Sequence, residues 1–313
     1  PALRLVIEGS VDESAVEVSV ISLIEADEKE ALGSIGVELA QGSARQIRIG
    51  LRILSTLHAR AEPNERERLR SGWQTALSNN AFVLLRLWLA LGNDEPVHDA
   101  LSAAQDVTQV SEILFMLREA RCPFDSSQAL TLLAAPKART RFKSRVVEAL
   151  EFSMDPSAIP ALLDQMESQE RRTRPNRGYL KALNRTLGSL TGFKNREFTS
   201  EKWTEIWDRF EPRLDTSLEA LELFLGSDDP TVRQQSWHTA AALKTPTRQV
   251  AEAALAELAV AQDPKWISTL VAYLVHLPRV GRFTRPLVRL LERKEVSAVA
   301  LRALIRIYRQ PGA

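Results

Sequence analysis

Few side chains in this 313-residue sequence have types and spacings that indicate catalysis. Its four histidines are His58, His98, His238 and His276, and none stands in an H-E-x-x-H motif or directly before a glutamate. No nucleophile elbow, Walker A loop or dinucleotide fingerprint occurs. Gly33 and Gly36, in the segment G-S-I-G, predict a turn and not a phosphate-binding loop. We therefore expect no catalytic residue, no metal ligand and no cofactor.

The only cysteine in the sequence is Cys122, which excludes an intrachain disulfide and disfavours a structural zinc site. It lies between Arg121 and Pro123, where the arginine could lower the thiol pKa. No histidine is placed to activate it, so we expect an inert thiol. A single cysteine fits a reducing compartment, and we expect a cytoplasmic protein.

Aromatic and acidic residues gather at Trp203, Trp207 and Asp208, with Trp237 following later in the chain. Tryptophan can stack on an extruded base, and a carboxylate can stabilise a glycosyl cation, so this combination suits base excision. The simpler interpretation is that the tryptophans and Phe210 pack a helix against its neighbours while Asp208 is solvated. We prefer packing and keep base excision as the alternative.

Charge is distributed unevenly, although the formal net charge is only +1. Residues 1–136 carry 12 basic and 19 acidic side chains, whereas residues 137–196 carry 13 and 6. Residues 197–264 are again acidic, with 6 and 13, and residues 265–313 are basic, with 10 and 2. The basic side chains are mostly arginines, which bind carboxylate or phosphate in bidentate geometry. The alternative to ligand binding is that blocks of opposite charge neutralise one another.

The densest cluster of positive charge comprises Arg171, Arg172, Arg174, Arg177 and Lys181, with no acidic residue between positions 171 and 181. Pro175 keeps Arg174 out of helical geometry, so we expect this stretch to be a connection between two helices. Recognition sites often lie on loops that a rigid scaffold holds. We predict that these five side chains bind a partner.

The elements that must position these residues are helices. In 228–243, Asp229 and Pro230 form a helix start, and Val232, Ser236, Trp237 and Ala240 then share one face. Similar patterns, separated by Gly- and Pro-containing turns, recur along the chain. The expected helices are 14–26, 45–59, 65–77, 81–91, 96–104, 108–120, 126–133, 140–152, a helix opening at 155–163, 179–190, 218–225, 231–243, 247–259, 265–277, 282–291 and 296–308, with a further short helix opening near Phe198.

The segment beginning Asp229-Pro230 resembles the second helix of a HEAT repeat, D-P-x-V-R-x-x-A-A-x-A-L. Asp263-Pro264 follows 34 residues later, and the stretches 146–150 and 296–304 keep the same spacing. The resemblance implies an all-α fold, a right-handed alpha-alpha superhelix (a HEAT-like solenoid) of about eight helix pairs over residues 1–313. The tryptophan-containing stretch at about 193–214 is similar to an insertion in bacterial HEAT-repeat proteins.

This resemblance implies a non-catalytic scaffold that binds another protein, and the basic cluster favours an acidic segment as the ligand. The alternative is a nucleic-acid-binding solenoid. The most specific form of this alternative is an enzyme similar to the HEAT-like alkylpurine DNA glycosylases. A bilin-lyase-like protein is a third class, without a cofactor signature in the sequence. The most apolar run, 81–91, is short and contains Arg86, so we expect no membrane association.

Overall fold

The computed structural model describes residues 20–25, 28–135, 138–193, 197–243, 247–275 and 281–308, apart from the side chains of 281–283, 285 and 308. The chain divides into two compact units, Pro1–Ala100 and Leu101–Ala313, which we call unit 1 and unit 2. Each is described by itself. Throughout the described residues the regular structure is helical, so the prediction of an all-α chain is confirmed at that level.

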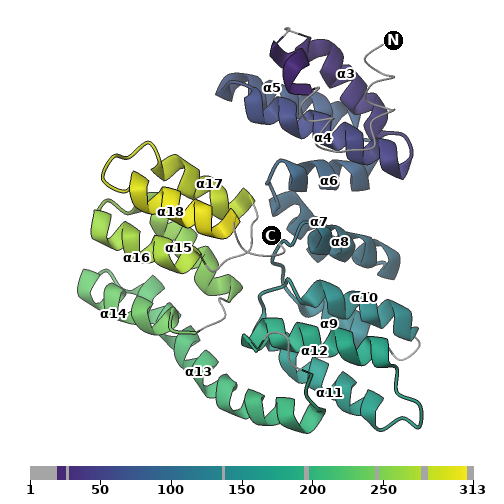
Figure 1. The fold of residues 1–313 in the computed structure, drawn as a ribbon, viewed down its shortest axis with the longest axis vertical. Coiled ribbons are helices and arrows are strands. Elements are labelled where there is room, and N and C mark those ends of the chain that lie inside the picture. The colour runs from purple at the N-terminus through teal and green to yellow at the C-terminus, as the bar shows by residue number, and fades with distance from the viewer. Residues whose placement is uncertain are drawn as a thin grey trace. The chain divides into compact units, whose positions relative to one another are not determined.

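Unit 1 is built from helices (Figure 1), and their buried apolar residues form one core. Residues 20–25 are helical and precede α3 (Lys29–Ala40), α4 (Ala44–Arg60), α5 (Pro63–Ala76) and α6 (Ala81–Ala90). The next helix, α7 (Glu95–Ala103), contains the boundary between the units. Within unit 1, α3 packs against α4, and α4 also packs against α6.

Unit 2 continues with helices of 8 to 27 residues and one short 3₁₀ helix. They are α8 (Val107–Glu119), α9 (Ser127–Ala134), α10 (Thr140–Leu150), the 3₁₀ helix η1 (Pro156–Ala158), α11 (Ile159–Glu170), α12 (Arg177–Thr191), α13 (Ser200–Gly226), α14 (Pro230–Ala240), α15 (Arg248–Val260), α16 (Pro264–Leu274), α17 (Gly281–Leu290) and α18 (Ser297–Tyr308).

Helices two positions apart in the chain pack together at several places in unit 2. Besides their neighbours in sequence, α10 packs against α8 and α12, while α11 packs against α13. The same rule places α15 against α17 and α16 against α18. At these places, helices that are two positions apart in the chain lie against one another.

Local signals set the helix ends. The Asp229 carboxylate accepts a hydrogen bond from the Thr231 N–H at 2.7 Å, and Asp263 caps Lys265 in the same way at 3.1 Å. Each cap precedes a proline at the first helical position, where the missing N–H is tolerated. Gly192 ends α12 in the left-handed conformation, with φ of 84°, as the sequence predicted.

The expectations for the segments 33–36 and 228–243 are partly wrong. Gly33 and Gly36 lie inside α3 and not in a turn, because Gly36 is buried against Leu54 and helix packing needs the missing side chain there. In α14, Ser236, Trp237 and Ala240 are buried as expected, but Val232 is 37% exposed. The helix ends at Ala240, so the apolar face is shorter than the pattern indicated.

The sequence predicted a short helix that opens near Phe198 and a separate helix at 218–225. The structure has one helix there instead, α13, of 27 residues (Figure 1). Buried residues recur along it at alternating steps of four and three, so one face remains continuous. They are Trp203, Trp207, Phe210, Leu214, Ser217, Leu221 and Phe224. Pro212 lies on the exposed side, where water can satisfy the carbonyl that lacks its helical donor.

Some expectations fall outside the described residues. The first helix, 14–26, is described only at residues 20–25, and His276 and the end of the helix expected at 265–277 are not described. Within the described part of the chain, no helix is both long and apolar enough to cross a membrane.

Candidate functional site

The basic cluster predicted from the sequence surrounds the connection between α11 and α12. Arg171 caps the end of α11, Arg172 and Arg174 lie in the connection, and Arg177 is the first residue of α12. Lys181 follows Arg177 by four residues and therefore shares its helix face. All five side chains are exposed. The connection comprises residues 171–176, so the expectation that Arg177 belongs to the loop is wrong by one position.

Local interactions fix this connection. The Asn176 side chain accepts a hydrogen bond from the Tyr179 N–H at 3.0 Å and so caps α12. Tyr179 is buried, and its hydroxyl donates to Gln165 of α11 at 3.3 Å. Burial raises the pKa of Tyr179, against the opposing effect of the Arg172 charge. The basic residues are thus displayed by an anchored segment, which lowers the entropy cost of ordering them on binding.

A further lysine, Lys143 of α10, joins this surface. Helix α10 packs against α12 (Figure 1), and the Thr186 hydroxyl of α12 donates to the Val147 carbonyl at 2.9 Å. The pKa of Lys143 is lowered, first by burial and second by the positive charge of Arg172. The sequence placed Lys143 in a basic block but gave no sign that it lies beside Arg172.

We call the set of Lys143, Arg172, Arg174, Arg177 and Lys181 the basic end. Among the described residues, no carboxylate lies within ion-pair distance of any of these five side chains. Their positive charges also stand near the N-terminus of α12, where the helix dipole adds positive potential. An anion is therefore the ligand whose charge this surface matches.

The nearby carboxylates are engaged elsewhere. Glu167 pairs with Arg171, which leaves that arginine less available than its neighbours. Glu170 accepts hydrogen bonds from the Ser200 N–H at 3.1 and 3.2 Å and from its hydroxyl, and so binds the start of α13. On the remainder of α10 and α12, Glu148 pairs with Arg118 at 2.7 Å and Glu151 with Arg185 at 2.6 Å. Unpaired positive charge is therefore left at the basic end.

The aromatic cluster considered for base excision is packed into the protein. Trp203 is 1% exposed and Trp207 8% exposed, while Asp208 and Arg209 are exposed. The Trp203 indole N–H donates to the Asn184 side-chain oxygen of α12 at 2.8 Å, and the same oxygen accepts from the Phe198 N–H at 2.7 Å. Trp237 is 1% exposed and packs edge-on against Trp266 and Tyr273. These rings are not available to stack on a base in this conformation.

The structure also describes the other residues that the sequence analysis considered for chemistry, and among them His98 lies 3.2 Å from the Asp94 carboxylate. His58 is buried and accepts a hydrogen bond from Arg70 at 2.9 Å, and His238 is exposed. Cys122 is 3% exposed, with its sulfur 3.6 Å from the Pro123 carbonyl oxygen. In the basic stretch 265–313, the Arg293 guanidinium donates hydrogen bonds to the carbonyls of Ala261 and Gln262 and so holds a turn.

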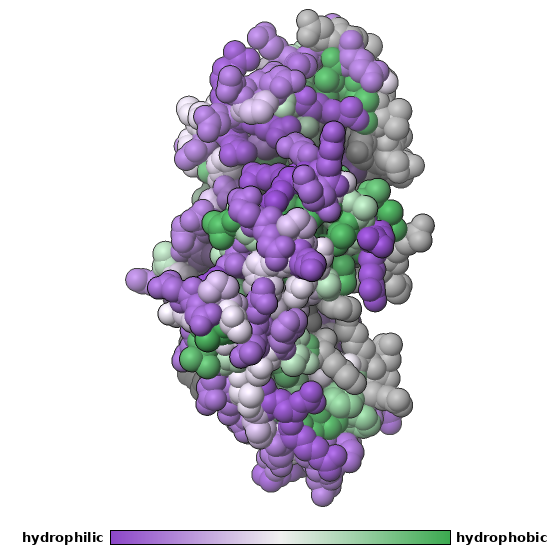
Figure 2. Space-filling view, turned by 90° about the vertical axis from the view of Figure 1, so that its left-hand side faces the viewer, coloured by the Kyte–Doolittle hydropathy of each residue, from purple (hydrophilic) through white to green (hydrophobic). Residues whose placement is uncertain are grey.

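The face seen in Figure 2 is mostly hydrophilic, with its apolar side chains in small separate groups. A contiguous apolar patch is the usual mark of a hydrophobic protein interface, so this face indicates none. Comparison with known proteins finds no matching family model, no matching curated protein and no matching solved structure.

Proposed function

We propose that this chain is a non-catalytic helical-repeat scaffold of the HEAT-like solenoid type. It binds another protein, which presents an acidic segment to the basic end. The observation that carries this proposal is that Lys143 and the exposed Arg172, Arg174, Arg177 and Lys181 lack carboxylate partners in the described structure. The recurring contact order of the helices in unit 2 supports the repeat architecture.

A carboxylate-rich segment suits this surface better than a small anion does. The basic side chains come from three segments of the chain, namely α10, the connection and α12. A flexible acidic chain can contact such a dispersed set, and electrostatic attraction would accelerate its association. Arginine also forms bidentate pairs with carboxylates, which favours the three arginines as the principal contacts.

The first test compares binding of a Glu-rich peptide and of duplex DNA to the intact chain, by fluorescence anisotropy at several salt concentrations. The variant replaces Arg171, Arg172, Arg174 and Arg177 by glutamine. The matched control replaces Arg209, Arg213, Arg289 and Arg306, four exposed arginines elsewhere in unit 2, and changes the net charge equally. We expect the first variant to bind the peptide about 10-fold more weakly, with a reduced salt dependence, and the control to bind as the wild type does.

Equal weakening by both variants would show that only net charge matters and would contradict a site at the basic end. Tighter binding of DNA than of the peptide, with a steep salt dependence, would favour the nucleic-acid alternative. The enzymatic form of that alternative predicts excision of alkylated bases that is lost in Asp208→Asn. The buried tryptophans do not support it, and we expect no excision.

A further inference from the structure

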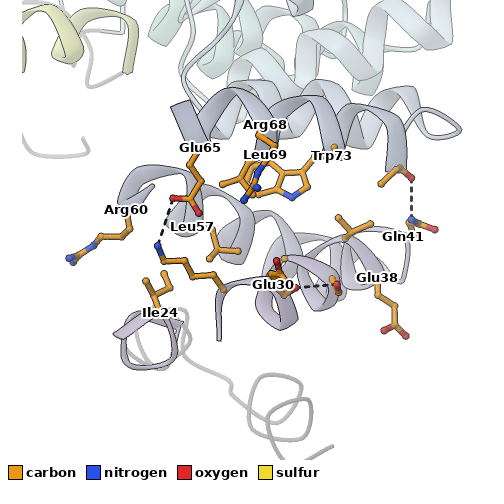
Figure 3. Close-up of a pocket in the computed structure, with 16 residues that line it drawn as sticks. Ile24, Glu30, Glu38, Gln41, Leu57, Arg60, Glu65, Arg68, Leu69 and Trp73 are labelled. Carbon is orange, nitrogen blue, oxygen red and sulfur yellow. Dashed lines mark hydrogen bonds and ion pairs between the residues drawn. The ribbon is translucent and has the colours of Figure 1, made fainter. Parts of the chain in front are cut away.

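A cavity of about 680 Å³ lies in unit 1, in a region separate from the basic end (Figure 3). Helices α3 and α5 form its two walls, and the C-terminal part of α4 forms its base. Each wall presents residues three and four positions apart, which places them on one helix face. The volume lies within the range of about 300–1,000 Å³ that is common for small-molecule sites.

The interior of this cavity is mainly apolar. Val37 of α3, Leu57 of α4 and Leu69 of α5 contribute aliphatic surface, and Trp73 adds the edge of its ring (Figure 3). The Trp73 ring is packed into the protein: it is 5% exposed, and its centroid lies 6.5 Å from that of the His58 ring. An apolar ligand body would therefore be desolvated against a preformed surface.

Two interactions join the walls at opposite ends of the cavity (Figure 3). At one end the Lys29 ammonium lies 3.7 Å from the Glu65 carboxylate, and at the other the Gln41 amide donates to the Ala76 carbonyl at 3.4 Å. Lys29 and Gln41 are separated by about 18 Å along α3. A peptide that ran through the cavity from end to end would have to break these interactions. A short, elongated molecule can lie between them.

The two walls carry a glycine each at positions that open onto space. A β-carbon added at Gly33 of α3 or at Gly72 of α5 would have no atom within 4 Å. The width of the cavity therefore depends on the absence of these two side chains. This also makes both positions suitable for obstruction, because a larger residue would enter the cavity without displacing packed atoms.

Three basic and three acidic side chains line the cavity, and Arg68 is the cation directed over its apolar surface. Glu65 pairs with Lys29, and in the described structure Arg60, Arg68 and Glu30 have no ion-pair partner. Figure 3 shows the Arg68 guanidinium beside Leu69 and Trp73, over the cavity, whereas Arg60 points away from it. An anionic group would meet Arg68 at the edge of the apolar surface, where a charge-assisted hydrogen bond is strong.

We propose that unit 1 binds an elongated apolar molecule with a single anionic head group, the chemistry of a medium-chain fatty acid. The chain lies along Val37, Leu57 and Leu69 between the two end interactions, and the head group binds Arg68. This site goes beyond the proposed scaffold function and does not depend on it.

The test is calorimetric titration of the intact chain with dodecanoate below its micellar concentration. We expect one dodecanoate per chain, and at least about 10-fold weaker binding by Gly72→Leu, whose side chain fills the cavity. The matched control is Gly226→Leu, which also adds a side chain where no atom lies within 4 Å, but at the end of α13 in unit 2. Gly33→Leu obstructs the opposite wall, so it gives a second test if Gly72→Leu lowers the melting temperature.

A separate set of variants and ligands tests whether the head group is anionic and binds Arg68. Arg68→Gln should weaken dodecanoate binding about 10-fold, because it removes a hydrogen bond to a charged group, and it should leave dodecanol binding unchanged. Arg60→Gln, with the same charge change on a side chain that points away, should bind both as the wild type does. Undiminished dodecanoate binding by folded Gly72→Leu and Gly33→Leu would overturn the site. Equal or tighter binding of dodecyltrimethylammonium would overturn the anionic head group.

Discussion

Gly50 of α4 contacts the backbone of Gly36 in α3 so closely that a β-carbon on Gly50 would lie 2.5 Å from the Gly36 carbonyl oxygen. The same β-carbon would lie 2.6 Å from the Ala40 nitrogen, and one on Gly36 would lie 2.7 Å from Leu54 Cδ2. Helices α3 and α4 thus pack with their backbones in contact at these glycines. This packing places α3 as one wall of the cavity.

We predict that Gly50→Ala lowers the free energy of unfolding by about 1–3 kcal/mol, because the added methyl group must displace backbone atoms. Gly72→Ala is the matched control, since its β-carbon has open space in the middle of α5. It should raise the free energy of unfolding by about 0.5–1 kcal/mol through helix propensity. Urea denaturation followed by circular dichroism measures both, and a Gly50→Ala variant as stable as the wild type would contradict this packing.

Gly36 and Gly50 show which part of the fold could not be predicted from the sequence alone. Helix periodicity predicted most helices to within a few residues, because their apolar faces and caps are local. The segment containing Gly33 and Gly36 was interpreted as a turn, since glycine usually ends helices. Only the approach of α4, more than ten residues later, explains why α3 retains a glycine at position 36. Likewise, Pro212 and the polar segment around it hid the continuous helix α13.

A second prediction concerns Asn184, whose side-chain oxygen accepts hydrogen bonds from Trp203 and Phe198. Asn184→Ala leaves the buried indole N–H without a partner, so it should reduce the free energy of unfolding by about 2–4 kcal/mol. Asn64→Ala, on an exposed turn of α5, should change it by less than about 0.5 kcal/mol. Amide hydrogen exchange should show the loss of protection concentrated at the start of α13. Uniform loss along the chain would argue against a local anchor.

The basic site was partly predictable for a similar reason. A run of arginines around a proline is a local feature, so the connection between α11 and α12 was found directly from the sequence. Glu170 binds Ser200, 30 residues away, and Lys143 lies near Arg172 only because α10 packs against α12. Both facts decide how much unpaired charge remains, and both depend on tertiary contacts that periodicity does not encode.

A third prediction follows from the lowered pKa of Asp125. Its carboxylate accepts hydrogen bonds from Ser127 at the start of α9, and Arg248 lies 3.6 Å away, so Ser127 first and Arg248 second favour the ionised form. A folded-state pKa below the unfolded value stabilises the fold above about pH 4, and this stability is lost as the pH falls through the folded-state pKa. Asp125→Ala should therefore be less stable than the wild type at pH 7, and the difference should shrink below about pH 4.

Urea midpoints at pH 7, 5 and 3 measure this effect. Arg248→Gln removes only the smaller of the two causes, so its pH dependence should lie between those of the wild type and Asp125→Ala. A difference between wild type and Asp125→Ala that stays constant over this range would mean that ionisation of Asp125 does not contribute to stability.

The last prediction concerns Pro212, which lies inside α13 on its exposed side. Proline lacks the N–H that would donate to the carbonyl four residues earlier, and its ring crowds that carbonyl. The buried face of α13 passes this point without interruption, from Phe210 to Leu214. Packing on that face, and not helix propensity, therefore keeps α13 continuous.

Pro212→Ala should restore the missing hydrogen bond and raise the free energy of unfolding by about 1–3 kcal/mol, less any entropy gained by the unfolded chain. Glu211→Ala, at the adjacent exposed position, should change it by less than about 0.5 kcal/mol. A lower melting temperature for Pro212→Ala, with Glu211→Ala unchanged, would instead show that the proline sets a bend that both Trp203 and Phe224 need for packing.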